Sequence, residues 1–483
     1  MNRNVTIVVH GFGTFAIVYR HLIELAKCEA PHIKWAMILP TSHHLDVIRE
    51  VLDDASILCL ENEQARVTPR IDDLAELSAY GGNIYADIEA EKKVFKHRPG
   101  REQLSRAVEI YRIYKRFLLR MQATHILLSQ AETYEANLLS SLAAELGIPA
   151  MEPTSLRNLG GLYFSRDTRE TLPRHRQVTL ELLDRATDFL ARFRQHGAAA
   201  NDFYAEWMAN ETTLPLYQKP WLRRAANFVR RTIKNPRLFE PQLFLTSIRY
   251  TFPKTRDRVR GVRAVYNATQ FDIGGVDELP SHFIYYPLQT SPESSINTLE
   301  PYYVDQLRAL DAIRLSMPSH FTLVVKEHPS TIDVRKSSFY GVLRRKAGIQ
   351  IAHYRLPSLQ LIRRAGMTIS VTGSATLEAF LLGRPSLVLG HCFIAEYLGG
   401  ICSFHDLASR MRHGLSNPPS DADITRAVAE LLSIRYDCIF RPPDEEGQLA
   451  ARPSNIRRLL HALLDHLDKL NSSLAADPRD ATA

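Results

Sequence analysis

The sequence has no long apolar run and little cysteine, and both shortages narrow the classes of protein to consider. Its longest apolar stretches, such as residues 387–390, fall far short of the roughly 20 residues that a membrane-spanning helix needs. The five cysteines are scattered, odd in number and without a C-x-x-C pair, which argues against a disulfide framework and a zinc site. We therefore expect a cytoplasmic protein with no transmembrane helix and no metal.

Acidic residues are absent from one segment, residues 219–237, although the whole chain carries a formal charge of only +7. Its basic residues are Lys219, Arg223, Arg224, Arg230, Arg231, Lys234 and Arg237. Such a local excess suits an anionic membrane or a polyanionic glycan at least as well as nucleic acid, and we expect no nucleic-acid partner. On a helix, Trp221, Leu222 and Phe228 would share one face, which predicts peripheral attachment to the inner face of the cytoplasmic membrane. Packing of that face on the fold, with solvated arginines, is the alternative.

Strand-like and helix-like stretches alternate along most of the 483 residues, a length that suits two or three domains. The predicted strands lie at residues 5–9, 34–39, 56–60 and 125–129, and then at 283–286, 321–326, 367–371 and 386–389. This alternation predicts parallel βαβ units, and so two doubly wound, Rossmann-like α/β domains that bind ligands at the carboxyl ends of their strands.

The predicted boundaries follow the changes in pattern along the chain. We expect an N-terminal α/β domain at 1–167, a helical, basic insertion or linker at 168–264, a C-terminal α/β domain at 265–420, C-terminal helices at 421–470 and a disordered tail at 471–483.

The first predicted strand is followed by Gly11-x-Gly13-x-x-Ala16, which matches a dinucleotide-binding fingerprint. A nicotinamide site would also need an acid at the end of the second strand, where Pro40-Thr41-Ser42 stands instead. We therefore expect Gly11 and Gly13 to form a plain or acceptor-facing turn.

The predicted strand at 321–325 runs directly into Lys326, Glu327, His328 and Pro329. A cation, an acid and an imidazole thus come to the carboxyl end of a strand. His328 could bond a phosphate oxygen or a leaving phosphate, with Lys326 adding positive charge. A buried histidine bonded to the backbone is the alternative.

The next predicted strand opens through Thr372, Gly373 and Ser374 into a helix that contains Thr376 and Glu378. Free backbone N–H groups, hydroxyls and the positive end of a helix dipole meet there, which favours an anion. The alternative is simple capping, with Ser374 as the N-cap and Glu378 in the first turn.

A polar cluster at 286–295 follows the first strand of the same predicted domain. Its Gln289 and Glu293 could contact a base or a sugar, and a turn rich in proline and serine is the alternative.

These motifs occur in a characteristic order: Pro-Leu-Gln-x-x-Pro-Glu-Ser, then Val-Lys-Glu-His-Pro, then Ser-Val-Thr-Gly-Ser-Ala-Thr-Leu-Glu-Ala, and finally Gly-Arg-Pro. They resemble the bacterial capsular polysaccharide biosynthesis family, which includes the Kdo transferases of capsule and lipopolysaccharide assembly. The resemblance covers residues 283–390, and more loosely 129–164. It implies a GT-B fold and a CMP-activated sugar donor held by His328, Pro329, Ser374 and Thr376, with no further cofactor.

The N-terminal domain should then supply the catalytic carboxylate. Glu132 follows a predicted strand and Glu135 lies in the first turn of the next helix, so Glu132 is the first choice. It could act as a base in inversion or as a nucleophile in retention, and His328 could assist the leaving group. A capping box is the alternative role of Glu135. Asp421 and Asp423 are expected to open a helix rather than to bind a metal.

The sequence thus predicts a glycosyltransferase of surface polysaccharide synthesis that moves a sugar, such as Kdo, from a CMP donor to a glycan or glycolipid acceptor. A CDP-alcohol polyol-phosphate transferase and a UDP-sugar transferase share the expected fold. An assembly protein that binds membrane and glycan without catalysis is the alternative of another class.

Overall fold

The computed structural model describes residues 5–64, 75–90, 99–129, 134–197, 271–290, 294–328, 335, 337–441 and 448–476. Glu132, Glu293, Pro329 and the basic segment 219–237 lie outside these residues. The predictions made for these positions therefore remain predictions.

The N-terminal domain is built on a six-stranded sheet in the order β3-β2-β1-β4-β5-β6. Its strands are β1 (Val5–His10), β2 (Ile33–Leu39), β3 (Ile57–Cys59), β4 (His125–Leu127), β5 (Ala150–Ser155) and β6 (Leu162–Ser165). All neighbours are parallel except β5 and β6, which form an antiparallel hairpin. The apolar, β-branched run of β1 is almost entirely buried, as expected for a strand covered on both faces.

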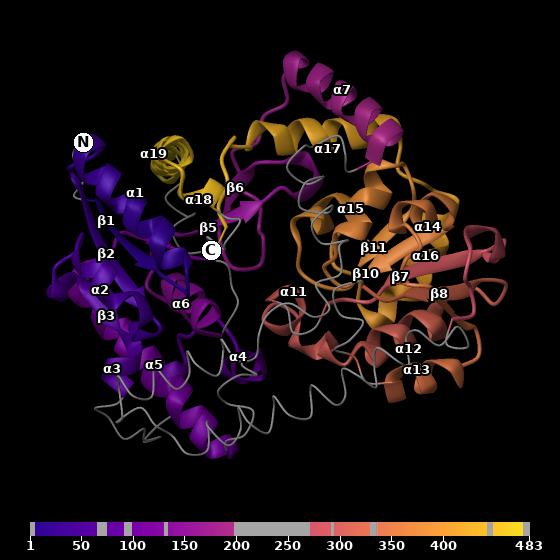
Figure 1. Ribbon diagram of the computed structural model, residues 1–483, viewed down its shortest axis with the longest axis horizontal. Helices are drawn as coiled ribbons and strands as arrows, with labels where there is room; N and C mark the ends of the chain where they lie inside the picture. The colour runs from indigo at the N-terminus through magenta and orange to yellow at the C-terminus, as the bar shows by residue number, and fades with distance from the viewer. Residues whose placement is uncertain are drawn as a thin grey trace.

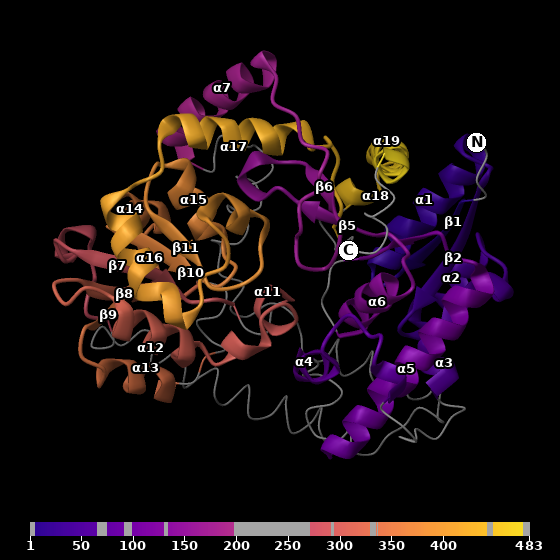
Figure 2. The ribbon, with the colours of Figure 1, turned by 180° about the vertical axis from the view of Figure 1, so that it is seen from behind.

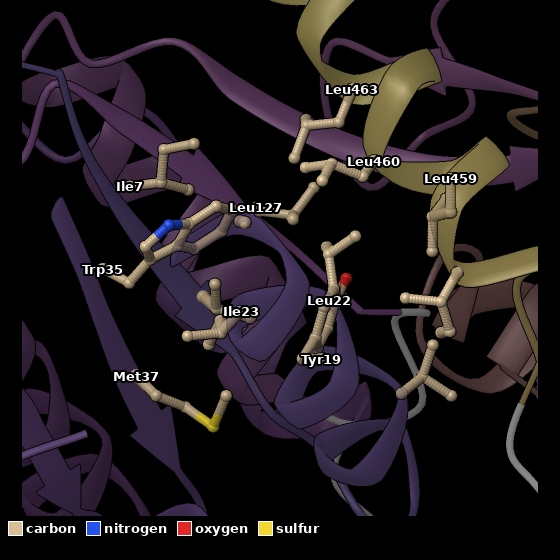
Figure 3. Close-up of a cluster of buried hydrophobic side chains, with 14 of the residues drawn as sticks. Ile7, Tyr19, Leu22, Ile23, Trp35, Met37, Leu127, Leu459, Leu460 and Leu463 are labelled. Atoms are coloured by element: carbon tan, nitrogen blue, oxygen red, sulfur yellow. The ribbon is translucent and has the colours of Figure 1, made fainter. Parts of the chain in front are cut away.

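Helices cover both faces of this sheet. They are α1 (Phe15–Glu29), α2 (Leu45–Arg49), α3 (Leu60–Gln64), α4 (Ile84–Ala90), α5 (Gly100–Met121) and α6 (Tyr134–Glu145). One core joins the sheet to α1 and α2, and a second joins the opposite face to α4, α5 and α6. Figure 3 shows the first core, in which Tyr19, Leu22 and Ile23 of α1 lie between the strand side chains and leucines of the last helix.

The C-terminal domain has a five-stranded, fully parallel sheet in the order β11-β10-β7-β8-β9. The strands are β7 (Phe283–Pro287), β8 (Thr322–Lys326), β9 (Ile349–Ala352), β10 (Met367–Ser370) and β11 (Ser386–Val388). Its helices are α11 (Ser294–Asn297), α12 (Gln306–Ser316), α13 (Ser337–Arg344), α14 (Ser358–Arg364), α15 (Ser374–Leu381) and α16 (Phe404–Ser416). The fold is thus the predicted pair of doubly wound α/β domains, a GT-B-like arrangement (Figure 1).

Helices from the predicted linker and from the C-terminal region connect the two domains. They are α7 (Leu180–His196), α17 (Asp421–Ser433), α18 (Gln448–Ala451) and α19 (Pro453–Ala476). The apolar face of α7 packs with α17 in a core that also includes side chains of α15 and of the β5-β6 hairpin. Helix α19 instead returns to the N-terminal domain and packs beside α1, as both ribbon views show (Figure 1, Figure 2).

The helices predicted at 421–470 are present and divide between the domains, because α17 packs with the C-terminal sheet's helices and α19 completes the N-terminal core. The tail expected to be disordered from residue 471 is helical up to Ala476, since α19 continues to that residue. Asp421 and Asp423 do open α17 as predicted, with the Ser420 hydroxyl accepting a hydrogen bond from the Asp423 N–H.

No helix within the described part of the chain is both long enough and apolar enough to cross a membrane.

Candidate functional site

The two sheets reverse their strand order at equivalent places, between β1 and β4 in the N-terminal domain and between β7 and β10 in the C-terminal domain. Ligands of doubly wound sheets bind beyond the carboxyl ends of the strands at such switch points. The loops that follow these strands are therefore the parts of the molecule to compare.

Loops that follow strands of the two sheets also touch each other. The Asn137 side chain of α6 donates a hydrogen bond to the Thr298 carbonyl, 3.0 Å away, in the loop beyond β7. Asn158, in the loop after β5, lies beside the Glu378 carboxyl of α15. The Phe393 N–H, beyond β11, donates to a Glu170 carboxylate oxygen at 3.2 Å. The carboxyl ends of the two sheets thus face each other.

The C-terminal switch point brings Gln289 and Gly373 together. Gln306 holds the Gln289 backbone on both sides, accepting from its N–H at 2.7 Å and donating to its carbonyl at 2.8 Å. Arg335 donates to the same carbonyl at 2.9 Å. A Cβ atom on residue 373 would lie 3.1 Å from the Gln289 amide nitrogen, so the glycine lets this side chain approach the start of α15.

The turn into α15 is held by hydroxyl groups of its own strand and helix. The Gly373 N–H donates to the Ser370 hydroxyl at 3.1 Å, and the Thr376 hydroxyl donates to the Gly373 carbonyl at 3.0 Å. Gly373 is the N-cap, so Ser374 is the first helical residue and not the cap that the capping alternative assigned. The side chain of Ser374 is partly exposed beside the N–H groups of the first turn.

Thr376 has a structural role in this turn. It is completely buried and its hydroxyl bonds within the turn, so it shapes the loop, and its predicted contact with a donor remains a prediction. Thr372 is also buried, with an exposed fraction of 2%. Ser374 and the first N–H groups of α15 lie beside this turn, and the Gln289 amide, in a residue that is 6% exposed, lies against Gly373.

The Lys326-Glu327-His328 motif ends β8, next to β7, and its three side chains have different environments. Glu327 is buried and accepts hydrogen bonds from Arg335 and Tyr340, both at 2.6 Å. Glu327 therefore anchors Arg335, which in turn holds the Gln289 carbonyl. His328 is partly exposed, and burial together with the Lys326 charge lowers the pKa of its imidazole, so the ring is neutral near pH 7.

Lys326 and Glu378 form the electrostatic centre of the site. Burial lowers the pKa of Lys326 to about 8, against the opposing charges of Glu327 and Glu378. Burial likewise raises the pKa of Glu378 to about 7, although Asn158 and Lys326 favour its charged form. The Lys326 ammonium lies 3.4 Å from the Tyr354 carbonyl and is 4% exposed. It therefore adds positive charge from below the loops instead of touching a ligand directly.

The N-terminal switch point is built from smaller and more deeply buried groups. His10 is fully buried, its Nδ1 lies 3.2 Å from the Ser129 hydroxyl, and burial lowers its pKa to about 4. A Cβ atom on Gly11 would lie 2.9 Å from the Met37 sulfur, and Gly13 has a φ of +51°. The glycine pattern therefore serves close packing and a left-handed turn, and whether this turn faces an acceptor remains a prediction.

Of the two predicted catalytic carboxylates, Glu135 lies at the start of α6. Glu135 lies in its first turn, partly exposed, and its charge raises the pKa of the buried Tyr114 in addition to the effect of burial. Asn137, two residues later, makes the bond to Thr298 described above. The first turn of α6 therefore borders the C-terminal domain, as the proposed role of a carboxylate there requires.

Two groups at the domain junction were missed by the sequence analysis. Arg157 and Glu170 form a two-pronged ion pair of 2.7 and 2.8 Å, and both have positive φ angles. Arg157 also stacks on Phe393, 5.1 Å from the ring centroid. His391 pairs with Glu300 just beyond β11. A histidine directly after a strand was the only signal for the second group, since its partner is 91 residues away.

Comparison with known proteins gave matches among solved structures alone. The Thermosulfurimonas dismutans protein KpsC, described as a β-Kdo 2,7 transferase, is 14% identical with a TM-score of 0.32, over 66% of this chain and 88% of that chain. A Methanocaldococcus jannaschii UDP-GlcNAc 2-epimerase is 13% identical with a TM-score of 0.24, over 89% of this chain and 99% of that chain. A Rickettsia bellii UDP-N-acetylglucosamine 2-epimerase is 10% identical with a TM-score of 0.28, over 98% of this chain and 100% of that chain.

No family model and no curated protein sequence matches the chain. A Kdo transferase, the kind of enzyme that the motifs of residues 283–390 resemble, is thus among the solved structures that the chain matches. The fold is established by the chain's own sheets, and the function rests on the chain's own residues.

Proposed function

We propose that the chain is a glycosyltransferase that binds a CMP-activated sugar, such as CMP-Kdo, at the C-terminal switch point and transfers the sugar to a glycan or glycolipid. The observation that carries the proposal is the meeting of the Gln289 amide with the start of α15. A helix N-terminus offers N–H groups and a positive dipole end to a phosphate, and the amide can contact a base or a sugar.

The groups around this point suit an anionic ligand. Lys326 supplies positive charge from beneath the loops, and His328 stands partly exposed at the end of the neighbouring strand. Its neutral imidazole can donate one hydrogen bond to a phosphate oxygen. Glu378, with a pKa of about 7, is partly protonated at neutral pH and so repels a phosphate less than an ordinary carboxylate would.

In this proposal the N-terminal domain presents the acceptor. The first turn of α6 borders the C-terminal domain and contains Glu135, while Glu132, the first choice for the catalytic carboxylate, precedes the described part of α6. The sugar would pass from the phosphate to an acceptor hydroxyl between the two sheets. Retention or inversion would follow from whether a carboxylate attacks the sugar or only assists the acceptor.

Titration of thermal stability with CMP, CDP and UDP tests the proposed donor. CMP at about 100 times its dissociation constant should add on the order of 2.7 kcal/mol to the free energy of unfolding. Stabilisation by UDP but not by CMP would favour the UDP-sugar alternative. Transfer of a polyol phosphate from a CDP-alcohol also leaves CMP, so release of CMP from a CDP-alcohol but not from CMP-Kdo would favour the polyol-phosphate alternative. Release of CMP from CMP-Kdo in the presence of cell-envelope glycan fractions then tests transfer itself.

The His328→Ala variant tests the site. It should lower CMP affinity and transfer by about 10-fold or more, because a hydrogen bond to a charged group contributes roughly 1.5–3 kcal/mol. His413→Ala, on the exposed surface of α16, is the matched control and should behave as the wild type. If His328→Ala unfolds while its activity per folded molecule is unchanged, the histidine is structural and this part of the proposal fails.

Peripheral attachment to the membrane through residues 219–237 is a separate part of the proposal. Each basic residue near an anionic leaflet contributes about 1 kcal/mol. Sedimentation with anionic but not neutral liposomes, lost at high salt, would support it, and equal recovery in both supernatants would refute it.

A further inference from the structure

A histidine and a glutamate form a pair beside the proposed donor site. His391 lies three residues beyond the end of β11, and Glu300 precedes η9 (Pro301–Val304). One Glu300 oxygen accepts from the His391 backbone N–H at 2.7 Å and also contacts the ring Nδ1. The Glu300 side chain is 13% exposed and that of His391 is 36% exposed. The carboxylate is therefore fixed, whereas the ring remains accessible.

The pair is held by local packing as well as by charge. A Cβ atom on residue 390 would lie 2.5 Å from Glu300 Cγ, so the carboxylate occupies space that only a glycine leaves open. With Nδ1 turned to a carboxylate, the neutral ring carries its proton on Nδ1 and a lone pair on Nε2. Within the described residues no hydrogen bond is made by Nε2. An imidazole whose Nδ1 is held by a carboxylate is oriented to accept a proton at Nε2.

The loop that carries His391 also reaches the acceptor side of the molecule. Phe393, two residues later, bonds to Glu170 and lies under Arg157, both from the β5-β6 hairpin region of the N-terminal domain. Thr298, two residues before Glu300, accepts the bond from Asn137 of α6. The pair thus lies between two contacts that join the domains, and β11 is adjacent to β10, whose loop starts α15.

We propose that His391 Nε2 is the base that takes the proton of the acceptor hydroxyl during transfer. This inference rests on the proposed function. The acceptor O–H bond breaks and its proton moves to Nε2, the oxygen forms its bond to the anomeric carbon, and the group on that carbon leaves with its bonding electrons. Glu300 is a positioning residue that stabilises the imidazolium. The proton passes to water when the product leaves.

Variants of the full-length protein test this role, with CMP-Kdo and a cell-envelope glycan fraction as substrates. His391→Ala and His391→Gln should each lower the rate of CMP release by about 100-fold or more, the usual contribution of a general base, while CMP affinity stays within about 2-fold of the wild type. Added imidazole should restore part of the rate of His391→Ala, a result that loss of a purely structural side chain would not give. Glu300→Gln should lose less, about 10-fold, because it keeps the backbone bond.

His461 provides a matched control, since its ring lies 3.3 Å from Glu29 on the far side of the N-terminal domain, in another histidine–glutamate pair. His461→Gln should retain the wild-type rate. Two results would overturn the role of His391 without affecting the proposed function. One is a His391→Ala rate within 3-fold of an active wild type. The other is a slow rate that added imidazole restores in neither His391→Ala nor His391→Gln, although both variants are folded. A wild type that neither binds CMP nor releases it from CMP-Kdo would refute the proposed function, and this inference with it.

Discussion

The five parallel strands β1–β5 of the N-terminal sheet have the same order as the five strands of the C-terminal sheet, yet the two switch points are built in different ways. In the C-terminal domain the loops after β7 and β10 present an amide, a hydroxyl and a helix N-terminus over a buried cation. In the N-terminal domain the corresponding described residues are a fully buried histidine and a glycine packed against Met37. The same topology therefore fixes where a ligand can bind, and the side chains at the strand ends decide which domain holds an anion.

The largest expected difference between the domains is in how far the free energy of unfolding falls when one carboxylate is replaced by an amide. Glu327→Gln should lower the free energy of unfolding by about 3–5 kcal/mol, because it leaves the buried Arg335 without its counter-charge. It should also loosen the Gln289 carbonyl and weaken CMP binding. Urea denaturation followed by fluorescence measures the first effect, and CMP titration measures the second.

Glu50 of the N-terminal domain is the matched control, since it pairs at 2.9 Å with Arg20 and its side chain is 59% exposed. Glu50→Gln should cost less than about 1 kcal/mol, as solvent-exposed pairs usually do. Equal losses in the two variants would contradict the claim that Glu327 organises the C-terminal loop.

One glycine at each switch point gives a second, smaller contrast. Gly11→Ala should destabilise the protein by about 1–3 kcal/mol, because the added methyl group overlaps Met37 in the core. Gly373→Ala should change stability less and CMP affinity more, since its methyl group meets the Gln289 amide at the proposed site. Parallel thermal melts and CMP titrations of both variants check this. A larger loss of stability in Gly373→Ala together with a larger loss of CMP affinity in Gly11→Ala would contradict the comparison.

Glu378 gives a third contrast, in the pH dependence of stability. Its folded pKa of about 7 exceeds the ordinary value of 4.5, so the stability it contributes is complete below about pH 4.5 and is lost as the pH rises through 7. Glu378→Gln should exceed the wild type by on the order of 1 kcal/mol near pH 5 and by on the order of 3 kcal/mol at pH 8. Thermal melts at both pH values measure this difference, and a constant offset would show that the carboxyl titrates normally.

Much of the C-terminal domain could be predicted because its strands are short apolar runs that end abruptly in polar motifs. Strand β8 and its Lys326-Glu327-His328 end, and β10 with its Thr-Gly-Ser turn, lie where the sequence placed them. Helix α12 begins at Gln306, since Asp305 caps it and Pro301 starts a separate short turn before it. Strand β9 was missed because four residues carry too little pattern.

What the sequence could not show depends on contacts between distant residues. Glu300 and His391 are 91 positions apart, and Arg157 meets Phe393 only because the hairpin of one domain reaches the loop of the other. The return of α19 to the N-terminal core is equally invisible, since an amphipathic helix does not specify which sheet it covers. The family resemblance assigned Thr376 to the donor, and the sequence could not show that its hydroxyl also bonds within the turn.

Hydrogen–deuterium exchange with and without saturating CMP tests most directly the claim that the C-terminal switch point is the nucleotide site. The account predicts slower exchange of the amides at residues 288–290 and 373–378, which the nucleotide would cover or order, and little change at residues 10–16 of the N-terminal turn. Protection at residues 10–16 with none at residues 373–378 would contradict it.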